Sequence, residues 1–363
     1  MEMMVAAVSD NPMAEKLLSK RVQEMVINNN IEEPPQPYVS RVQEEEDPPP
    51  MAAMGAPPLV PIIDLSRIKS SSEEEESKDE LYKIKAALSS WGCFQAIGQG
   101  ISSSLLDEIR KIGREFFELA MDEKKKYAKT VHEFEGYGAD PVPEQGQFLD
   151  WSDRLFLTVF PQDQRKYQFW PNNPHSFRGI VEEYMEKMKE LTEFICKAMA
   201  KSLNLDENCF LEQFGDQSQF QIRFNYYSPC KWSDRVLGLK PHSDSSGFTI
   251  IMEDEQGLQV LKDDKWFNVP NNPHSILVLM GDQMQIMSNG ILKSPVHRVL
   301  SNSERDRISV AVFYTPEVGK EIEPQNGLIN EENPKLFKKI KDYADIYFPY
   351  YQKGQRAIHT AQL

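Results

Sequence analysis

The sequence predicts an α+β protein in which helices surround a β-rich core. Apolar residues keep a helical period over much of the first 215 residues. After that point short β-rich segments alternate with turns, and a last helical pattern follows near the C-terminus. Strands at that density are typical of an antiparallel sandwich or barrel. No internal repeat is visible, so we expect a single β core.

The helix-rich part begins with a short amphipathic segment at residues 13–28, which is followed by several prolines. Further helices are predicted over 78–90 and 177–203. Another is expected to start at Ser104, with Asp107 completing a capping-box-like pattern, and to run to about residue 119. Strands are predicted at 60–65 and 91–97, whereas residues 134–170 show no clear period.

The β-rich part and the C-terminus complete the chain. A final helix is expected at 334–350, and strands are predicted at 219–227, 247–252, 257–261, 275–280, 284–287, 296–300 and 307–315. We therefore divide the chain into four regions: an N-terminal extension with an acidic, proline-rich loop (1–58), a helix-rich region (59–210), a catalytic core (211–320) and a C-terminal helix and tail (321–363).

Composition excludes some classes of function. The net charge is −15, from 41 basic and 56 acidic residues, which argues against a nucleic-acid partner. Neither a long apolar run nor a secretory signal is visible, so no membrane partner is expected. The four cysteines form no C-x-x-C pair and are expected to be free thiols. These features predict a cytoplasmic protein, which we expect to be a monomer.

Three residues form a pattern typical of a metal site. His242 and Asp244 make an H-x-D unit, and residues two apart in an extended segment point to the same side. His297 opens another β-like segment 53 positions after Asp244. Two histidines and one carboxylate are the facial triad of non-haem Fe(II) oxygenases, which leaves coordination positions open. A structural zinc site would usually use four ligands.

A second unit lies ten residues after His297. Arg307 and Ser309 alternate with apolar residues, so one face of the predicted strand carries a guanidinium and a hydroxyl. A buried arginine needs an anion, and its planar fork fits a carboxylate co-substrate. Taken alone, Arg307 is better explained by a structural salt bridge. Its position after H-x-D…H favours the co-substrate.

With these motifs the sequence resembles the plant Fe(II)/2-oxoglutarate-dependent dioxygenases, whose pattern is H-x-D…H…R-x-S with an N-Y-Y-P-x-C-like segment upstream. Here that segment reads Asn225-Tyr226-Tyr227-Ser228-Pro229-Cys230. Near the N-terminus the resemblance is to the senescence-related and codeine-demethylase-like group. The chain departs from the family at Gly98-Gln99, where Asn-His is usual, and at Ser228, where proline is frequent.

The resemblance implies a distorted double-stranded β-helix, a jelly roll of the cupin type, flanked by helices. It implies that His242, Asp244 and His297 bind Fe(II). The co-substrate 2-oxoglutarate would be held by Arg307, Ser309, Tyr227 and Asn225, although Asn225 and Tyr227 could also be ordinary strand residues. Reaction with O₂ would give succinate and CO₂, with ascorbate keeping the iron reduced.

The implied function is hydroxylation, O-demethylation or desaturation of a plant specialised metabolite of flavonoid, alkaloid, terpenoid or coumarin type. Aromatic candidates point to an apolar, flat substrate that is bound by Phe313, Tyr137, Arg223 and Phe156. Three alternatives stay open: a hormone-metabolising oxygenase of gibberellin or auxin type, a non-catalytic cupin-like binding protein, and an oxidase of the ethylene-forming type.

Overall fold

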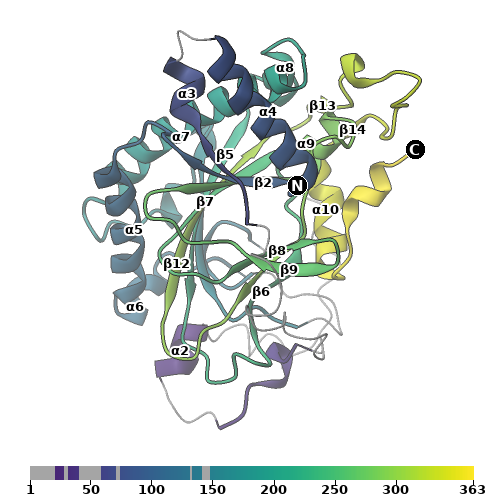
Figure 1. Cartoon of the computed structure of the whole chain (residues 1–363). Helices are drawn as coiled ribbons and strands as arrows, with labels where there is room; N and C mark the ends of the chain where they lie inside the picture. Colours follow the sequence, from purple (N-terminus) through teal and green to yellow (C-terminus); the bar gives the residue numbers. More distant parts are fainter. Residues whose placement is uncertain (1–20, 28–31, 41–58, 71–73, 131–132, 141–147) are drawn as a thin grey trace.

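The computed structural model describes residues 21–27, 32–40, 59–70, 74–130, 133–140 and 148–363 (Figure 1). Its strands form two main sheets. The eight-stranded major sheet has the order β1-β2-β10-β7-β12-β5-β4-β3, and the four-stranded minor sheet has the order β6-β11-β8-β9. β1 and β2 are parallel, and every other pairing within the two sheets is antiparallel.

The strands of the major sheet are β1 (Ile62–Asp64), β2 (Cys93–Ile97), β3 (Gly136–Gly138), β4 (Asp153–Phe160), β5 (Gln219–Tyr227), β7 (Phe248–Glu253), β10 (Ile276–Met280) and β12 (Arg307–Thr315). Those of the minor sheet are β6 (Leu237–His242), β8 (Leu258–Lys262), β9 (Lys265–Asn268) and β11 (His297–Leu300). A short pair, β13 (Glu321–Ile322) and β14 (Ile340–Lys341), lies apart. The described helices are α2 (Val22–Ile27), α3 (Leu65–Ser70), α4 (Glu74–Ser90), α5 (Ser103–Glu118), α6 (Met121–Lys125), α7 (Phe177–Ser202), α8 (Cys209–Phe214), α9 (Asp282–Met287) and α10 (Tyr343–Gln352).

Two apolar layers hold the sheets and helices together. Helices α4, α5 and α7 bury their apolar residues against the outer face of the major sheet, and this layer is the largest core (Figure 1). The inner face packs on the minor sheet through a second cluster that includes Cys93, Leu279, Leu258 and Val299. The α+β prediction is thus confirmed, with a sandwich of two sheets whose major sheet is covered by helices on its outer face.

In β12, alternating apolar and polar residues determine which face of the strand packs under the helices. Ile308, Val310 and Val312 belong to the core under the helices, so the intervening residues point toward the minor sheet. This inner face carries Arg307 and Ser309, as the alternation predicts. Both are almost fully buried.

Several predicted elements are corrected by the structure. Residues 284–287 belong to helix α9, because a run of four residues is too short to reveal its period. The segment without a clear period contains β4, whose eight residues are all buried, so no polar face marks it. Helix α5 takes its N-cap from Ser102, which accepts the Leu105 N–H, and not from Ser104. The last helix begins at Tyr343, and strand β6 was not predicted.

The N-terminal helix is described only from Val22 to Ile27, and the rest of the predicted 13–28 segment and the acidic loop lie outside the described residues. The four-region division stays a prediction. In space, strands β1 to β4 of the helix-rich region complete the major sheet by pairing with β10 and β5. Among the described residues no helix is long and apolar enough to cross a bilayer.

Candidate active site

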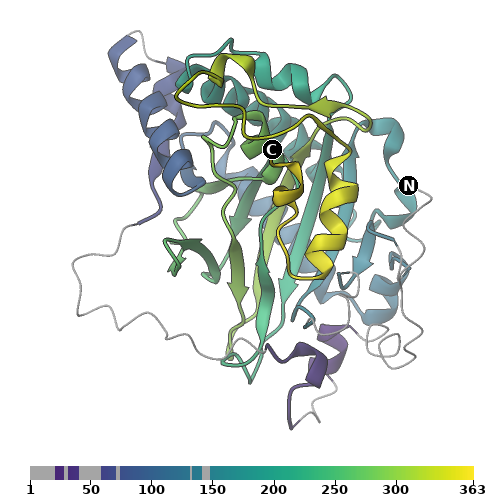
Figure 2. The ribbon, with the colours of Figure 1, turned by 90° about the vertical axis from the view of Figure 1, so that its right-hand side faces the viewer.

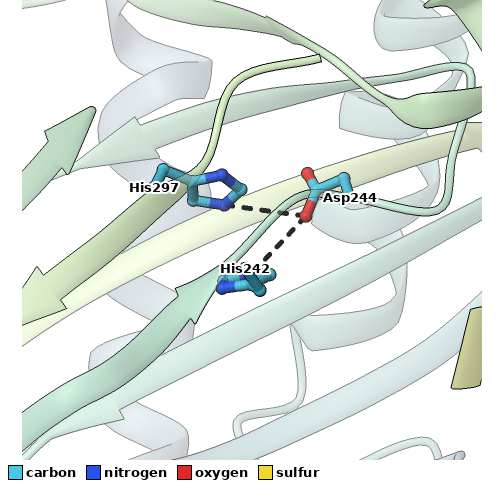
Figure 3. Close-up of side chains that lie close together, drawn as sticks. All are labelled: His242, Asp244 and His297. Carbon is cyan, nitrogen blue, oxygen red and sulfur yellow. Dashed lines mark ion pairs between the residues drawn. The ribbon is translucent and has the colours of Figure 1, made fainter. Parts of the chain in front are cut away.

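Three polar side chains converge beside the inner face of the major sheet. His242 ends β6, Asp244 follows two residues later, and His297 begins β11 in direct register with His242. The Nε2 atoms of His242 and His297 lie 3.5 Å and 3.6 Å from the same oxygen, Asp244 Oδ1 (Figure 3). All three could ligate one metal ion, since their ligand atoms lie within 4.8 Å of one another.

The surroundings orient these ligand atoms. Nδ1 of His242 donates to the Lys240 carbonyl at 2.8 Å, and Nδ1 of His297 lies 3.4 Å from the Pro295 carbonyl. Each imidazole therefore presents Nε2 to the centre of the cluster. The hydroxyl of Thr249 donates to Asp244 Oδ2, which leaves Oδ1 for the metal.

Electrostatics puts the cluster in the protonation state that a metal requires. Burial raises the pKa of Asp244, but His297, His242 and the hydrogen bond from Thr249 outweigh it and bring the pKa to about 2. Burial, together with the neighbouring His242, lowers the pKa of His297 to about 4. At neutral pH Asp244 is ionised and His297 is neutral, which suits coordination to a divalent cation.

A polar row crosses the inner face of the major sheet. Cross-strand pairing aligns Arg154 of β4, Asn225 of β5, Ser309 of β12 and Glu253 of β7. Asn225 donates from Nδ2 to the Ser309 hydroxyl at 3.0 Å. Arg307 lies two residues before Ser309 on the same face of β12, opposite Tyr227, and its guanidinium carbon is 4.8 Å from the centre of the Tyr227 ring.

The Arg307 guanidinium can accept a further anion. Its Nε donates to the Glu255 carbonyl at 2.8 Å and its Nη2 to Glu253, whereas buried Nη1 has no hydrogen-bond partner among the described residues. Two glycines of the opposing layer make room for this subsite. A Cβ at Gly238 would lie 2.8 Å from the Tyr227 ring, and one at Gly257 would lie 3.1 Å from Arg307 Cδ. The residues present therefore fit a carboxylate ligand.

An aromatic series leads from the sheet back to the metal cluster. The Phe156 and Phe313 rings are 6.0 Å apart, and Phe134 contacts Phe156. Phe134 also lies 4.7 Å from Phe348 of α10, the helix that faces the viewer in Figure 2. Tyr351 of the same helix lies 5.7 Å from the His242 ring. Ring contacts thus connect Phe156 and Phe313 through Phe134 and α10 to His242, and the role of the two phenylalanines in substrate binding stays a prediction.

Arg223 belongs to a buried charge network. It forms an ion pair with Asp140 at 2.8 Å and donates to Asn225, while Arg154 pairs with the same Asp140. Burial raises the pKa of Asp140, but the two guanidinium groups outweigh this and hold it well below its usual range. Arg154 Nη2 is buried without a partner among the described residues.

Tyr137 lies elsewhere. It pairs with Leu155, which faces away from Arg154 and Phe156 on β4, and its fully buried ring packs on Phe116 of α5 at 5.6 Å. The predicted place at the substrate is corrected: Tyr137 is part of the core under the helices.

Sequence reasoning missed several site residues. Glu253, Arg154 and Asp140 acquire their ion pairs only when strands come together in the sheet, whereas Thr249 contacts Asp244 through the turn that precedes β7. No local signal distinguishes Arg154, because it follows Ser152 and Asp153 in a run of three polar residues. Asp282 was also missed. It is fully buried and accepts hydrogen bonds from Ser243, Tyr343 and Arg356.

A two-histidine, one-carboxylate cluster inside a β-sandwich, next to a buried arginine, defines the class of non-haem iron oxygenases. Residues 218–316 match the 2OG-Fe(II) oxygenase superfamily, and residues 60–173 match the family described as non-haem dioxygenase in morphine synthesis, N-terminal. The chain belongs to this family of plant 2-oxoglutarate-dependent dioxygenases, so the predicted family and enzyme class are confirmed.

Named relatives agree with this assignment. Protein SRG1 of Arabidopsis thaliana is 36% identical over 337 residues, which cover 92% of this chain and 93% of the relative. Codeine O-demethylase of Papaver somniferum is 37% identical over 289 residues, 79% of this chain and 80% of the relative. The crystal structure of JOX2 in complex with 2OG, Fe and JA superimposes with a TM-score of 0.83 at 32% identity, covering 95% of this chain and 98% of JOX2. The double-stranded β-helix prediction is thereby confirmed.

Proposed function

We propose that this dioxygenase couples the oxidation of an apolar plant specialised metabolite to the decarboxylation of 2-oxoglutarate. The observation that carries the proposal is the convergence of His242 Nε2, His297 Nε2 and Asp244 Oδ1. In this account the three residues hold Fe(II) on one face. Such a three-residue ligand set would leave coordination positions for the co-substrate and O₂.

Arg307, Ser309, Tyr227 and Asn225 hold 2-oxoglutarate by its distal carboxylate. Nη1 of Arg307 and the Ser309 hydroxyl donate to it, and Asn225 fixes the position of Ser309. Iron, 2-oxoglutarate and O₂, when bound, supply the oxidising power and yield succinate and CO₂. The contribution of the chain is to bind, to orient and to keep the buried site dry.

Phe156, Phe313 and Arg223 place the organic substrate. The two rings form an apolar wall suited to a flat molecule, which supports a flavonoid, alkaloid, terpenoid or coumarin scaffold. The relation to codeine O-demethylase supports O-demethylation as one outcome, beside hydroxylation and desaturation.

A second candidate is a hormone-metabolising oxygenase, because the charge network favours a substrate with a carboxylate. Among the described residues, the two guanidinium groups of Arg154 and Arg223 form ion pairs with a single carboxylate, that of Asp140. In addition, the buried Nη2 of Arg154 has no hydrogen-bond partner there. Small acidic hormones of the gibberellin or auxin type carry such a group, and the structure of JOX2 contains JA.

A screen of product masses separates these proposals. Purified protein is incubated with Fe(II), 2-oxoglutarate and ascorbate as reductant, together with a metabolite panel in which each carboxylic acid is paired with its methyl ester. Gain of one oxygen means hydroxylation, loss of CH₂ means demethylation and loss of two hydrogens means desaturation. Turnover of neutral scaffolds supports the first candidate, and turnover of acids but not their esters supports the second. No product with any panel member contradicts both.

We further propose a cytoplasmic monomer. All four cysteines are unbridged, which agrees with a reducing compartment. Light scattering of the eluted protein tests the monomer: a mass near 41.8 kDa supports it, and a multiple of that mass contradicts it.

A further inference from the structure

Arg307 is buried against an acidic side chain of the same sheet. Glu253 ends β7, next to Ser309 of β12 in register, and its Oε2 accepts a hydrogen bond from Arg307 Nη2. The Arg307 and Glu253 side chains are only 5% and 10% exposed. Solvent therefore screens this ion pair little.

The contacts of the guanidinium limit how a ligand can approach it. Nε donates to the Glu255 carbonyl and Nη2 to Glu253, so Nη1 is the guanidinium nitrogen that has no partner among the described residues and can donate to a ligand carboxylate. The ligand would arrive beside Ser309, the cross-strand neighbour of Glu253. Two carboxylates would then share one guanidinium.

Two anions on one buried cation compete. Arg307 carries one positive charge and can neutralise only one carboxylate. The ligand carboxylate is therefore attracted less strongly by Arg307, and it is also repelled by the carboxylate of Glu253. The neighbouring acid Asp254 forms its own ion pair with Arg114 at 2.6 Å. Burial, together with the neighbouring Asp254, raises the pKa of Glu253 in spite of the Arg307 guanidinium.

We propose that Glu253 sets the affinity for 2-oxoglutarate by competing with its distal carboxylate for Arg307. Glu253 is a positioning residue that aligns the guanidinium through Nη2 and at the same time weakens binding of the dicarboxylate. The inference rests on the proposed use of Arg307 for 2-oxoglutarate. The proposed effect of Glu253 acts on the distal carboxylate of the co-substrate and not on the metal ligands.

The test is a calorimetric titration of Mn(II)-loaded protein under argon with two ligands. One ligand is 2-oxoglutarate, and the other is 2-oxopentanoate, which keeps the metal-chelating end and replaces the distal carboxylate by a methyl group. E253Q keeps an acceptor for Nη2 but removes the charge. We expect the dissociation constant for 2-oxoglutarate to fall about tenfold in E253Q, because like-charge repulsion in a buried site is lost. The value for 2-oxopentanoate stays within about twofold.

Glu304, exposed in the loop before β12, supplies the matched control. E304Q makes the same change of charge and leaves both dissociation constants unchanged. If E253Q fails to fold, E253A carries the same prediction, since it also removes the carboxylate. An unchanged or higher dissociation constant for 2-oxoglutarate in the Glu253 variant, or an equal change for both ligands, overturns the role of Glu253. If the wild-type protein binds no 2-oxoglutarate at all, the proposed function itself fails.

Discussion

At the scale of residues, hydrogen bonds from neighbouring groups orient the side chains that could bind the metal. Thr249 takes one oxygen of Asp244, so the other faces both imidazoles. Lys240 has two functions: its carbonyl orients His242, and its buried ammonium pairs with Asp150 at 2.9 Å. Orientation by such outer contacts is usual for metal ligands.

Replacement of Arg307 should affect the co-substrate and not the metal. Arg307→Ala removes the buried cation, and we expect the dissociation constant for 2-oxoglutarate to rise about a hundredfold. Affinity for Mn(II) should change little, because no metal ligand is touched. Calorimetry of both ligands checks this, and an unchanged affinity for 2-oxoglutarate would contradict the assignment.

The stability of the metal-free protein should depend on His297. Its folded pKa is about 4, against an ordinary value of 6.5, so the unfolded chain binds the proton more readily. The free energy of unfolding therefore falls as the pH drops below the unfolded value and stops falling below the folded one. Between pH ~7 and ~5 the titration of His297 lowers the free energy of unfolding by about 2 kcal/mol. Urea unfolding should show a smaller loss in His297→Gln, and equal losses in both proteins would refute the assignment.

At the scale of elements, α10 is fastened to the segment that carries Asp244. Tyr347 of α10 donates to the Ser243 carbonyl, and Tyr343 donates to Asp282 Oδ2 at 2.8 Å. The Asp282 N–H in turn donates to the Asp244 carbonyl at 2.8 Å. The C-terminal helix thus supports the metal cluster, which its sequence alone did not indicate.

Loss of the Tyr343 hydroxyl tests this support. Tyr343→Phe leaves the fully buried Asp282 carboxylate with one donor fewer, which should lower the free energy of unfolding by about 1–3 kcal/mol. Tyr82, which is 73% exposed on α4, provides the control Tyr82→Phe with no expected change. Denaturant unfolding measures both, and equal stability of the Tyr343 variant and the wild type would contradict the account.

Over the whole molecule, the sequence predicts those helices and strands that are determined by the local spacing of apolar residues. Helix α7 and strands β5 and β12 lie where periodicity placed them. Strand β4 was not predicted, because it is buried on both faces and so lacks a polar face. The sequence shows that Tyr137 is aromatic but not the face to which its side chain turns, which the structure places in the core under the helices. The Glu253 and Asp140 contacts depend on strand register across more than 50 residues, which composition and period do not encode.

The central claim is that one buried site holds Fe(II) and 2-oxoglutarate together. An anaerobic titration of 2-oxoglutarate into Fe(II)-loaded protein, metal-free protein and His242→Ala tests it without knowledge of the organic substrate. The account predicts one bound 2-oxoglutarate per Fe(II)-loaded chain, with affinity lowered at least about tenfold when the metal or His242 is absent. Equal affinity in all three proteins, or no binding to the Fe(II)-loaded chain, would contradict it.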